Sequence, residues 1–413
     1  MTGLPMPDVS VLDVLLHDEP IGTLTHFQGD RTLFAFNEAY VDDPDRPTLS
    51  LSFKDSLGDL ITDIRPTQTR VPPFFANLLP EGAMRDYLAE RAGVNPTREF
   101  FLLWVLGRDL PGALTIRPAD GEAWPRGKDQ PDREEQDLAR RHALRFSLAG
   151  VQLKLSAVKE ATGGLTIPAE GVGGSWIVKL PSTRLGGVPE NEFSMMSLAR
   201  RIGIDVPDVQ LVAMDAIAGL PDGMGDLAGQ ALAVQRFDRS AEGPVHMEDF
   251  AQVFGVYPDD KYRKASYRNI AEVIGIEAGD DAAAELIRRL VFSALIGNAD
   301  MHLKNWSLIY PDRRHAQLSP AYDLVSTIPY LPDDKAALTF ARTKRMDGLT
   351  LDEIAYLSAK AGLPRKPMTD AAKETVARFH DVWNADRGDL PISKQLAQAI
   401  DAHVAKLPIA REA

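Results

Sequence analysis

The sequence predicts an α+β fold of several domains, with strand-rich regions in the first part of the chain and a mainly helical C-terminal lobe. Short apolar runs that break into charge, at 175–181 and 232–237, have the length and composition of buried strands. Residues 284–296 are instead mostly helix-forming, with apolar residues that can bury one face. With 413 residues and 44% hydrophobic content, the chain can bury a large core.

Composition excludes several classes of protein. The chain has no cysteine, which rules out disulfides and thiolate metal sites. No stretch approaches the roughly 20 consecutive apolar residues of a membrane span, and the N-terminus lacks a basic-then-apolar signal pattern. The net charge of -13 disfavours broad binding to a phosphate backbone, so any stable DNA contact is expected through a basic partner. We therefore expect a cytoplasmic protein with no membrane association.

Domain boundaries are predicted from changes in composition. A segment dense in charge, Gly and Pro opens the range 119–140, which is interpreted as a linker after an N-terminal α+β domain at 1–118. A small lobe is expected at 141–240 and a mainly helical large lobe at 241–413. The mixed charges after Pro391 predict a terminal amphipathic helix.

Three polar residues near position 300 have the spacing of a phosphoryl-transfer site. Asp300 and Asn305 are placed like the catalytic-loop carboxylate and the metal-binding amide of protein kinases, and Asp323 follows a short hairpin pattern. Such a site needs a carboxylate near the attacking hydroxyl and oxygen ligands for Mg²⁺. We therefore predict Asp300 as the catalytic residue and Asn305 and Asp323 as metal ligands. The alternative is an ordinary turn followed by a helix cap.

The predicted local structure brings these residues together. The helix before the loop should end at Gly297 and release a polar segment. Residues 306–310 are predicted as a strand and 315–318 as the returning strand after a turn. A hairpin of this size would return Asp323 to the neighbourhood of Asn305, where both could face one metal ion.

A lysine that could neutralise nucleotide phosphates lies upstream. Lys179 stands near the end of the apolar strand 175–181, after a glycine-rich turn. A lysine on a buried strand is costly unless it is paired, which makes Lys179 a candidate phosphate ligand. The alternative is a strand-end lysine in solvent. A helical pattern to Arg201 follows, and Glu192 near its start is a candidate ion-pair partner of Lys179.

Two further segments suit a nucleotide. The apolar strand that ends at 235–237 is similar to a hinge between two lobes, whose backbone groups could meet an adenine edge. Residues 145–156 contain Gly150, which allows close backbone approach to an anion, and Lys154, which adds positive charge. The segment lacks a Walker or Gly-x-Gly-x-x-Gly pattern, and a plain strand-turn-strand is the alternative.

Together these motifs resemble the HipA type of bacterial serine/threonine kinase, the toxin of a type II toxin–antitoxin pair. Residues 147–154 are similar to the family's autophosphorylated serine and nucleotide loop, 177–181 to its lysine strand and 235–239 to its hinge. Residues 300–305 and 322–323 are similar to its catalytic loop and metal-binding aspartate.

The N-terminal region extends this resemblance. Residues 73–82 and 107–113 are similar to the family's N-terminal domain, so the likeness runs from about residue 10 to about residue 380. Two positions depart from the family pattern. Leu153 stands where the nucleotide loop often has Glu or Pro, and could alter the loop's position or the rate, whereas Gln235 stands where the hinge often has Glu.

The resemblance implies a bilobal protein-kinase-like fold related to the phosphoinositide kinases, with ATP and Mg²⁺ as cofactors. It implies self-inhibition by autophosphorylation at Ser147. The implied nucleotide-binding residues lie in the loop, the lysine strand, the hinge and the catalytic and metal segments: Ala149, Gly150, Val151, Gln152, Leu153, Lys154, Lys179, Gln235, Arg236, Phe237, His302, Lys304 and Tyr322. A packing or hydrogen-bonding role for His302 is equally compatible with the sequence.

The resemblance also implies partners. A small helix-turn-helix antitoxin of the HipB type would bring the chain to DNA only indirectly, and the substrate would be a translation protein such as an aminoacyl-tRNA synthetase. Two other classes stay open: an inactive kinase-fold module that acts as a corepressor with the antitoxin, and a kinase for a small molecule or lipid. Intact Asp300, Asn305 and Asp323 disfavour the first, and the segment around Ser147 disfavours the second.

Overall fold

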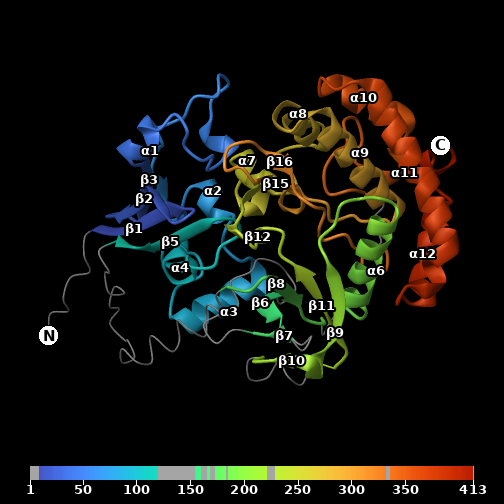
Figure 1. The fold of residues 1–413 in the computed structure, drawn as a ribbon, viewed down its shortest axis with the longest axis horizontal. Helices are drawn as coiled ribbons and strands as arrows, with labels where there is room; N and C mark the ends of the chain where they lie inside the picture. The colour runs from blue at the N-terminus through green and yellow to red at the C-terminus, as the bar shows by residue number, and fades with distance from the viewer. Residues whose placement is uncertain are drawn as a thin grey trace.

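The computed structural model describes residues 9–119, 154–159, 165–167, 173–182, 185–220, 228–331 and 335–412. The N-terminal sheet lies on the left of Figure 1, the small-lobe sheet lies below the centre, and a layer of helices closes the right-hand side. Most of the predicted linker, the predicted nucleotide loop from Ala149 to Leu153, and Ser147 lie outside the described residues.

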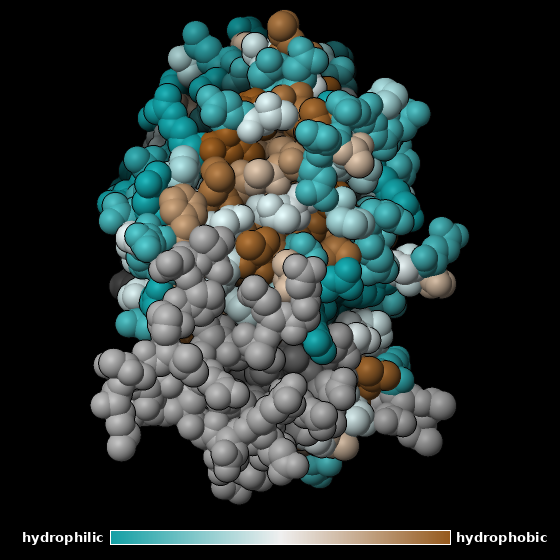
Figure 2. Space-filling model, turned by 90° about the vertical axis from the view of Figure 1, so that its left-hand side faces the viewer, coloured by the Kyte–Doolittle hydropathy of each residue, from teal (hydrophilic) through white to brown (hydrophobic). Residues whose placement is uncertain are grey.

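An antiparallel sheet forms the centre of the N-terminal region, with its described strands in the order β4-β3-β2-β1-β5. The strands are β1 (Val9–Leu16), β2 (Glu19–Phe27), β3 (Arg31–Phe36), β4 (Thr67–Gln68) and β5 (Leu114–Pro118). The helices are α1 (Glu38–Asp42), η1 (Leu51–Phe53), α2 (Pro73–Ala76), α3 (Gly82–Ala92) and α4 (Glu99–Leu106). Figure 2 views this side of the molecule and shows apolar side chains in the middle of the face, among hydrophilic ones.

The second sheet has its described strands in the order β10-β7-β6-β8-β11-β9. The strands are β6 (Lys154–Lys159), β7 (Leu165–Thr166), β8 (Trp176–Lys179), β9 (Val209–Ala213), β10 (Ile217–Ala218) and β11 (Gln230–Gln235), with η3 (Met214–Ala216) before β10. Helix α6 (Val188–Arg201) packs against β9 and β11, as Figure 1 shows. The apolar strands and the helix that the sequence predicts in this region are therefore present.

The two faces of the second sheet have different roles because side chains alternate along a strand. Leu155 pairs with Val178 across β6 and β8, and both are buried in one hydrophobic core with the N-terminal domain. Their neighbours Lys154 and Lys179 also pair across these strands and point to the opposite face. The N-terminal domain therefore supports the sheet from one side, while the two lysines reach the site on the other.

The large lobe is mainly helical, as the sequence predicts. Its helices are α7 (Phe250–Val253), η4 (Pro258–Asp260), α8 (Tyr267–Glu277), α9 (Gly279–Leu295), η5 (Leu303–Asn305), η6 (Met346–Gly348), α10 (Leu351–Lys360), α11 (Arg365–Asp386), η7 (Arg387–Asp389), α12 (Lys394–Val404) and α13 (Ile409–Glu412). Helix α12 is the predicted terminal amphipathic helix, and Ser393 caps its N-terminus. None of the helices in the described ranges is long and apolar enough to cross a membrane.

A small sheet pairs β14 (His246–Asp249), which precedes the predicted catalytic segment, with β15 (Ser307–Tyr310) and β16 (Gln317–Leu318), which follow it. A short ribbon of β12 (Arg239–Ser240) and β13 (Gly243–Pro244) lies before β14. The predicted hairpin is present, but its returning strand begins at Gln317 rather than at His315. The reason is local: the Asp312 carboxylate accepts hydrogen bonds from the His315 N–H at 2.8 Å and from the His315 ring at 2.7 Å. These bonds keep His315 in the turn.

Glu248 on β14 joins the N-terminal domain to the large lobe. Its fully buried carboxylate accepts hydrogen bonds from the Ser50 hydroxyl at 2.5 Å, the Leu51 N–H at 3.0 Å and the Tyr310 hydroxyl at 2.5 Å. Burial raises the pKa of Glu248 to about 7, although the three hydrogen bonds oppose the shift. The junction is therefore sensitive to pH near neutrality.

Glu248 is expected to make the folded protein less stable as pH rises from about 4.5 to about 7. In this window the unfolded chain loses the proton, since its glutamate has the ordinary pKa of 4.5, while the folded chain keeps it. The linked loss is on the order of 3 kcal/mol. Glu248→Gln should remove this loss. The difference between the urea midpoints of the variant and of wild type should therefore increase in favour of the variant from pH 5 to pH 8. Equal pH dependence in both proteins, with the exposed Glu242→Gln as control, would contradict the assignment.

Candidate active site

The catalytic loop begins where α9 ends. Gly297 follows the helix with a φ of +66°, a conformation that residues with side chains rarely adopt. A Cβ at this position would also lie 2.5 Å from the Ile328 side chain. Glycine therefore ends the helix as the sequence predicts, and the chain turns toward Asp300.

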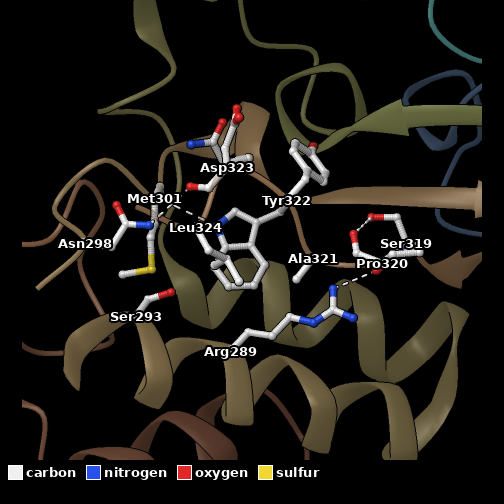
Figure 3. A pocket seen from close by; sticks show the side chains of 12 residues that line it. Arg289, Ser293, Asn298, Met301, Ser319, Pro320, Ala321, Tyr322, Asp323 and Leu324 are labelled. Atoms are coloured by element: carbon white, nitrogen blue, oxygen red, sulfur yellow. Dashed lines mark hydrogen bonds between the residues drawn. The ribbon is translucent and has the colours of Figure 1, made fainter. Parts of the chain in front are cut away.

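Two asparagines hold the loop in shape. Asn298 is buried, accepts the Asp300 N–H through Oδ1 at 3.1 Å and donates to the Asp323 carbonyl at 3.4 Å. Asn305 donates from Nδ2 to the Asp300 carbonyl at 2.8 Å. Figure 3 shows Asn298, Met301 and Asp323 on the wall of one pocket, with α9 below. Asn298 thus connects the catalytic loop to the predicted metal ligand, a role that the sequence did not suggest.

Asp323 has an uncommon backbone conformation. Its φ of +53° lies in the left-handed region, which few residues other than glycine adopt and which is frequent at functional sites. One carboxylate oxygen contacts Lys179, and Oδ2 lies 3.4 Å from Lys154 Nζ. The hairpin therefore returns Asp323 to the catalytic loop, and the carboxylate meets both lysines of the small lobe.

Lys179 is the centre of these ion pairs. It ends β8, is 5% exposed, and contacts both Asp323 and the buried Glu192 of α6. Burial opposes its charge, but Asp323 and Glu192 outweigh burial and raise the pKa of Lys179 above its usual value. Lys154 has the same neighbours with weaker contacts, and burial lowers its pKa. Lys179 is therefore buried and ion-paired, and its side chain does not extend into solvent.

The two aspartates of the site have opposite pKa shifts. Burial alone would raise the pKa of Asp323, but Lys154 and Lys179 hold it well below its usual range. Burial raises the pKa of Asp300, opposed by a hydrogen bond from Tyr262. A carboxylate that stays ionised suits a metal ligand, whereas a more basic carboxylate suits proton transfer. Each environment is compatible with the role predicted from the sequence, and both roles stay predictions.

The hinge offers backbone groups rather than side chains. The N–H groups of Gln235 and Arg236 are already bonded to the carbonyls of Asp208 and Ser175, at 2.8 and 2.9 Å. The Phe237 N–H has no acceptor within the described part of the chain. Phe237 is therefore the hinge position that can still donate to a ligand.

The Arg236 side chain has partners of its own, so the nucleotide contact predicted for this hinge position is left to its backbone. Its side chain is 3% exposed and donates to Asp109 at 3.0 Å and to Asp238 at 3.0 and 2.9 Å. Asp109 belongs to the N-terminal segment 107–113, and Gly112 of that segment also donates to Asp238 at 2.9 Å. The guanidinium therefore anchors the hinge to the N-terminal domain and does not face the nucleotide.

The Lys304 side chain points away from the nucleotide, which corrects its prediction as a nucleotide ligand. Its ammonium donates to the Asn77 carbonyl at 2.7 Å and lies 3.1 Å from Asp249 Oδ2. It therefore points toward the N-terminal domain. Tyr322 uses its hydroxyl to donate to the Lys304 carbonyl at 2.9 Å, while its ring lies 5.6 Å from the Phe237 ring between centroids. The aromatic face of Tyr322, beside the hinge, is what remains for a nucleotide.

His302 is buried beside Asp300, the predicted catalytic residue. Burial, with Lys261 and Lys304 nearby, lowers the pKa of His302 to about 3, so its ring is neutral at physiological pH. The ring packs edge-on against Tyr262, with 5.0 Å between centroids. Its Nδ1 has no hydrogen-bond partner among the residues that the structure describes. Packing is therefore one role of His302, and a nucleotide contact stays a prediction.

The arrangement fits a Mg²⁺ ion that is held partly by a nucleotide. No group of three or more His, Cys, Asp or Glu in the described ranges could hold a metal. Mg²⁺ in phosphoryl-transfer sites takes only one or two carboxylates and completes its shell with phosphates and water. Asp323 supplies an ionised carboxylate, and the Asn305 amide donates through Nδ2, which leaves Oδ1 as the ligand atom.

Comparisons with known proteins identify the relatives of this chain. A family model described as the HipA-like C-terminal domain matches residues 146–383, and one described as the HipA N-terminal domain matches residues 12–117. Two Sinorhizobium fredii proteins, each named a "Putative kinase", are similar to the chain along nearly its whole length. One is 61% identical over 98% of this chain and 99% of the relative, and the other is 32% identical over 90% and 92%.

A named kinase toxin and a solved structure from Shewanella oneidensis are also similar to this chain. Its serine/threonine-protein kinase toxin HipA is 28% identical over 86% of this chain and 84% of the relative. The solved complex of HipA, HipB and operator DNA from this organism matches with a TM-score of 0.72 and 23% identity, covering 97% of this chain and 96% of that one. This likeness confirms the predicted fold class, α+β with a bilobal kinase-like body. The chain belongs to the HipA family of serine/threonine protein kinases.

Proposed function

We propose that this kinase uses ATP and Mg²⁺ to phosphorylate serine or threonine in a protein and acts as a growth-inhibiting toxin. The observation that carries the proposal is the contact between Lys179 of β8 and Asp323, which the hairpin returns to the loop of Asp300. Small-lobe lysines on one side and a catalytic carboxylate on the other are the parts that phosphoryl transfer needs.

Asp300 is proposed as the proton acceptor. The substrate hydroxyl would give its proton to the carboxylate while its oxygen bonds to the γ-phosphorus and the bond from phosphorus to the ADP oxygen breaks. The raised pKa of Asp300 favours this transfer. The bond from Asn298 to the Asp300 N–H holds the loop in place meanwhile.

The lysines are proposed to bind phosphate. Lys179 is paired with Asp323 and Glu192, and Lys154 also faces Asp323. Nucleotide phosphates would bring negative charge to this pair of lysines and compete with Asp323 for them, while Glu192 keeps Lys179 in place. Asp323 would then turn to Mg²⁺ together with Asn305. The metal would neutralise the charge that develops on the transferred phosphoryl group.

The proposed toxin role and partners are based on the proteins to which this chain is similar. The Shewanella structure is a complex of HipA with HipB and operator DNA, which supports a HipB-like helix-turn-helix antitoxin that would link this chain to DNA. We propose a translation protein, such as an aminoacyl-tRNA synthetase, as the substrate. Phosphoproteomes of cells that express wild type or Asp300→Ala should differ at a serine or threonine of such a protein. Identical phosphoproteomes would contradict the kinase proposal.

Self-inhibition at Ser147 is part of the proposal, supported by the family resemblance of the segment around it. A phosphate there adds roughly -1.5 to -2 charges, close in sequence to Lys154. The added charge would repel the ATP phosphates that Lys154 is proposed to hold. Intact-mass analysis after incubation with Mg-ATP should show one phosphate on Ser147 and a parallel loss of activity. An active preparation without that phosphate would exclude this mode of inhibition.

A further inference from the structure

Tyr262 is an exposed aromatic residue that touches the catalytic carboxylate. Its hydroxyl donates a hydrogen bond of 2.8 Å to Asp300 Oδ1. Its side chain is 39% exposed, although the ring also packs against His302. The residue is therefore bonded to Asp300 through its hydroxyl and is partly open to solvent.

The segment that carries Tyr262 supports the catalytic loop at further points. The Lys261 carbonyl accepts the Leu303 N–H at 3.3 Å. The Tyr267 hydroxyl donates to the Met301 carbonyl at 2.9 Å. With the hydroxyl of Tyr262, three contacts from one segment thus hold successive parts of the loop. Contacts at three positions of the loop indicate that this segment supports it, because a single chance contact would not be repeated.

The same segment is anchored to the N-terminal domain. Lys261 donates to Glu81 at 2.7 Å, and Arg70 donates to Asp259 at 2.9 Å. The Arg70 guanidinium also lies over the Tyr257 ring, 4.1 Å from its centroid. These contacts fix the segment against the N-terminal domain, whose Glu81 also lies 3.7 Å from Lys304 of the loop, so the position of Tyr262 is set by packed structure.

We propose that Tyr262 is a positioning residue for Asp300 and that its ring forms a wall of the subsite for the acceptor protein. This inference rests on the proposed kinase function. Because the Tyr262 hydroxyl occupies Oδ1, the oxygen that faces the acceptor hydroxyl is Oδ2, and the carboxylate is held in one orientation. The exposed part of the ring then contacts the chain on either side of the acceptor serine or threonine.

Two variants separate the two parts of the proposal. Tyr262→Phe keeps the ring and loses the hydroxyl, and it should lower kcat by roughly tenfold or more, with the KM values for ATP and for the acceptor unchanged. Tyr262→Ala should lower kcat similarly and also raise the KM for the acceptor severalfold. The assay measures transfer of labelled phosphate to dephosphorylated casein. Tyr356→Phe, a tyrosine that is 37% exposed on α10, is the matched control and should behave as wild type.

Each outcome decides one statement. A wild-type kcat for Tyr262→Phe would overturn the positioning role, and an equal acceptor KM in Tyr262→Phe and Tyr262→Ala would overturn the wall.

A thermal-unfolding cycle tests the hydrogen bond without any measurement of activity. Tyr262→Phe should lower Tm in the wild-type background and have no effect when Asp300 is already alanine. Equal Tm losses in both backgrounds would overturn the hydrogen bond between Tyr262 and Asp300. A wild-type protein that labels no protein substrate would instead overturn the proposed kinase function, and the Tm values would still test the hydrogen bond.

Discussion

Asp300→Ala is expected to lower phosphoryl transfer by about 10²–10⁴-fold, the range that a general base supplies. The physical reason is that no other described carboxylate has the same position: Asp323 is held by two lysines, and its pKa is shifted in the opposite direction. The fold should survive, because the bonds from Asn298 and Asn305 use the backbone of Asp300, while its side chain bonds to the partly exposed Tyr262. Labelled-phosphate transfer and the far-UV circular dichroism spectrum measure the two effects.

The matched control is Asp381→Ala, which removes an exposed carboxylate from α11. It should transfer phosphate at the wild-type rate. Calorimetry with Mg-ATP should give the same dissociation constant for Asp300→Ala as for wild type, because the affected step is the transfer of a proton. Transfer at the wild-type rate by Asp300→Ala would show that the catalytic assignment is wrong.

Lys179→Met should have the largest effect on stability and nucleotide binding together. Removing one partner of a buried ion pair typically costs about 3–5 kcal/mol, because the other charge stays buried without compensation. Here that charge is Glu192, which is buried on α6 and contacts Lys179 directly. The urea midpoint should therefore fall, and the affinity for Mg-ATP should be lost with the proposed phosphate ligand.

The double variant Lys179→Met/Glu192→Gln separates the two effects of Lys179. Neutralising Glu192 removes the uncompensated buried charge, so part of the lost stability should return. The affinity for Mg-ATP should not return, because the phosphates still lack their ammonium partner. If calorimetry showed wild-type affinity in either variant, Lys179 would have no role in phosphate binding. If Glu192→Gln gave no recovery, the ion pair would not account for the stability loss.

Local sequence patterns located most of the described candidate site. Asp300, Asn305 and Asp323 are linked by a short loop and a hairpin, so their proximity follows from secondary structure alone. Lys179 was recognisable because an unpaired lysine on a buried strand is costly. The pairing with Glu192 follows from the short connection between β8 and α6.

The errors concern side chains whose partners are far away in the sequence. Arg236 and Asp109 are separated by 127 residues, and Lys304 and Asn77 by 227. The family resemblance implied both residues as nucleotide ligands, but packing against the N-terminal domain turns both cationic side chains away and leaves Arg236 only its backbone at the hinge. Tyr262 was missed for the same reason, since a single tyrosine outside any motif carries no spacing signal and acquires a role only when the fold brings it to Asp300.

The sequence by itself determined the fold class, the helix end at Gly297 and the residues predicted to form a phosphoryl-transfer site. These depend on local conformation and on residue type, which are written in short stretches of chain. The tertiary structure alone decided that segments 73–82 and 107–113 of the N-terminal domain hold the catalytic loop and the hinge. The physical reason is that a charged side chain in a folded protein takes the partner that packing leaves within reach, and that partner can lie anywhere in the chain.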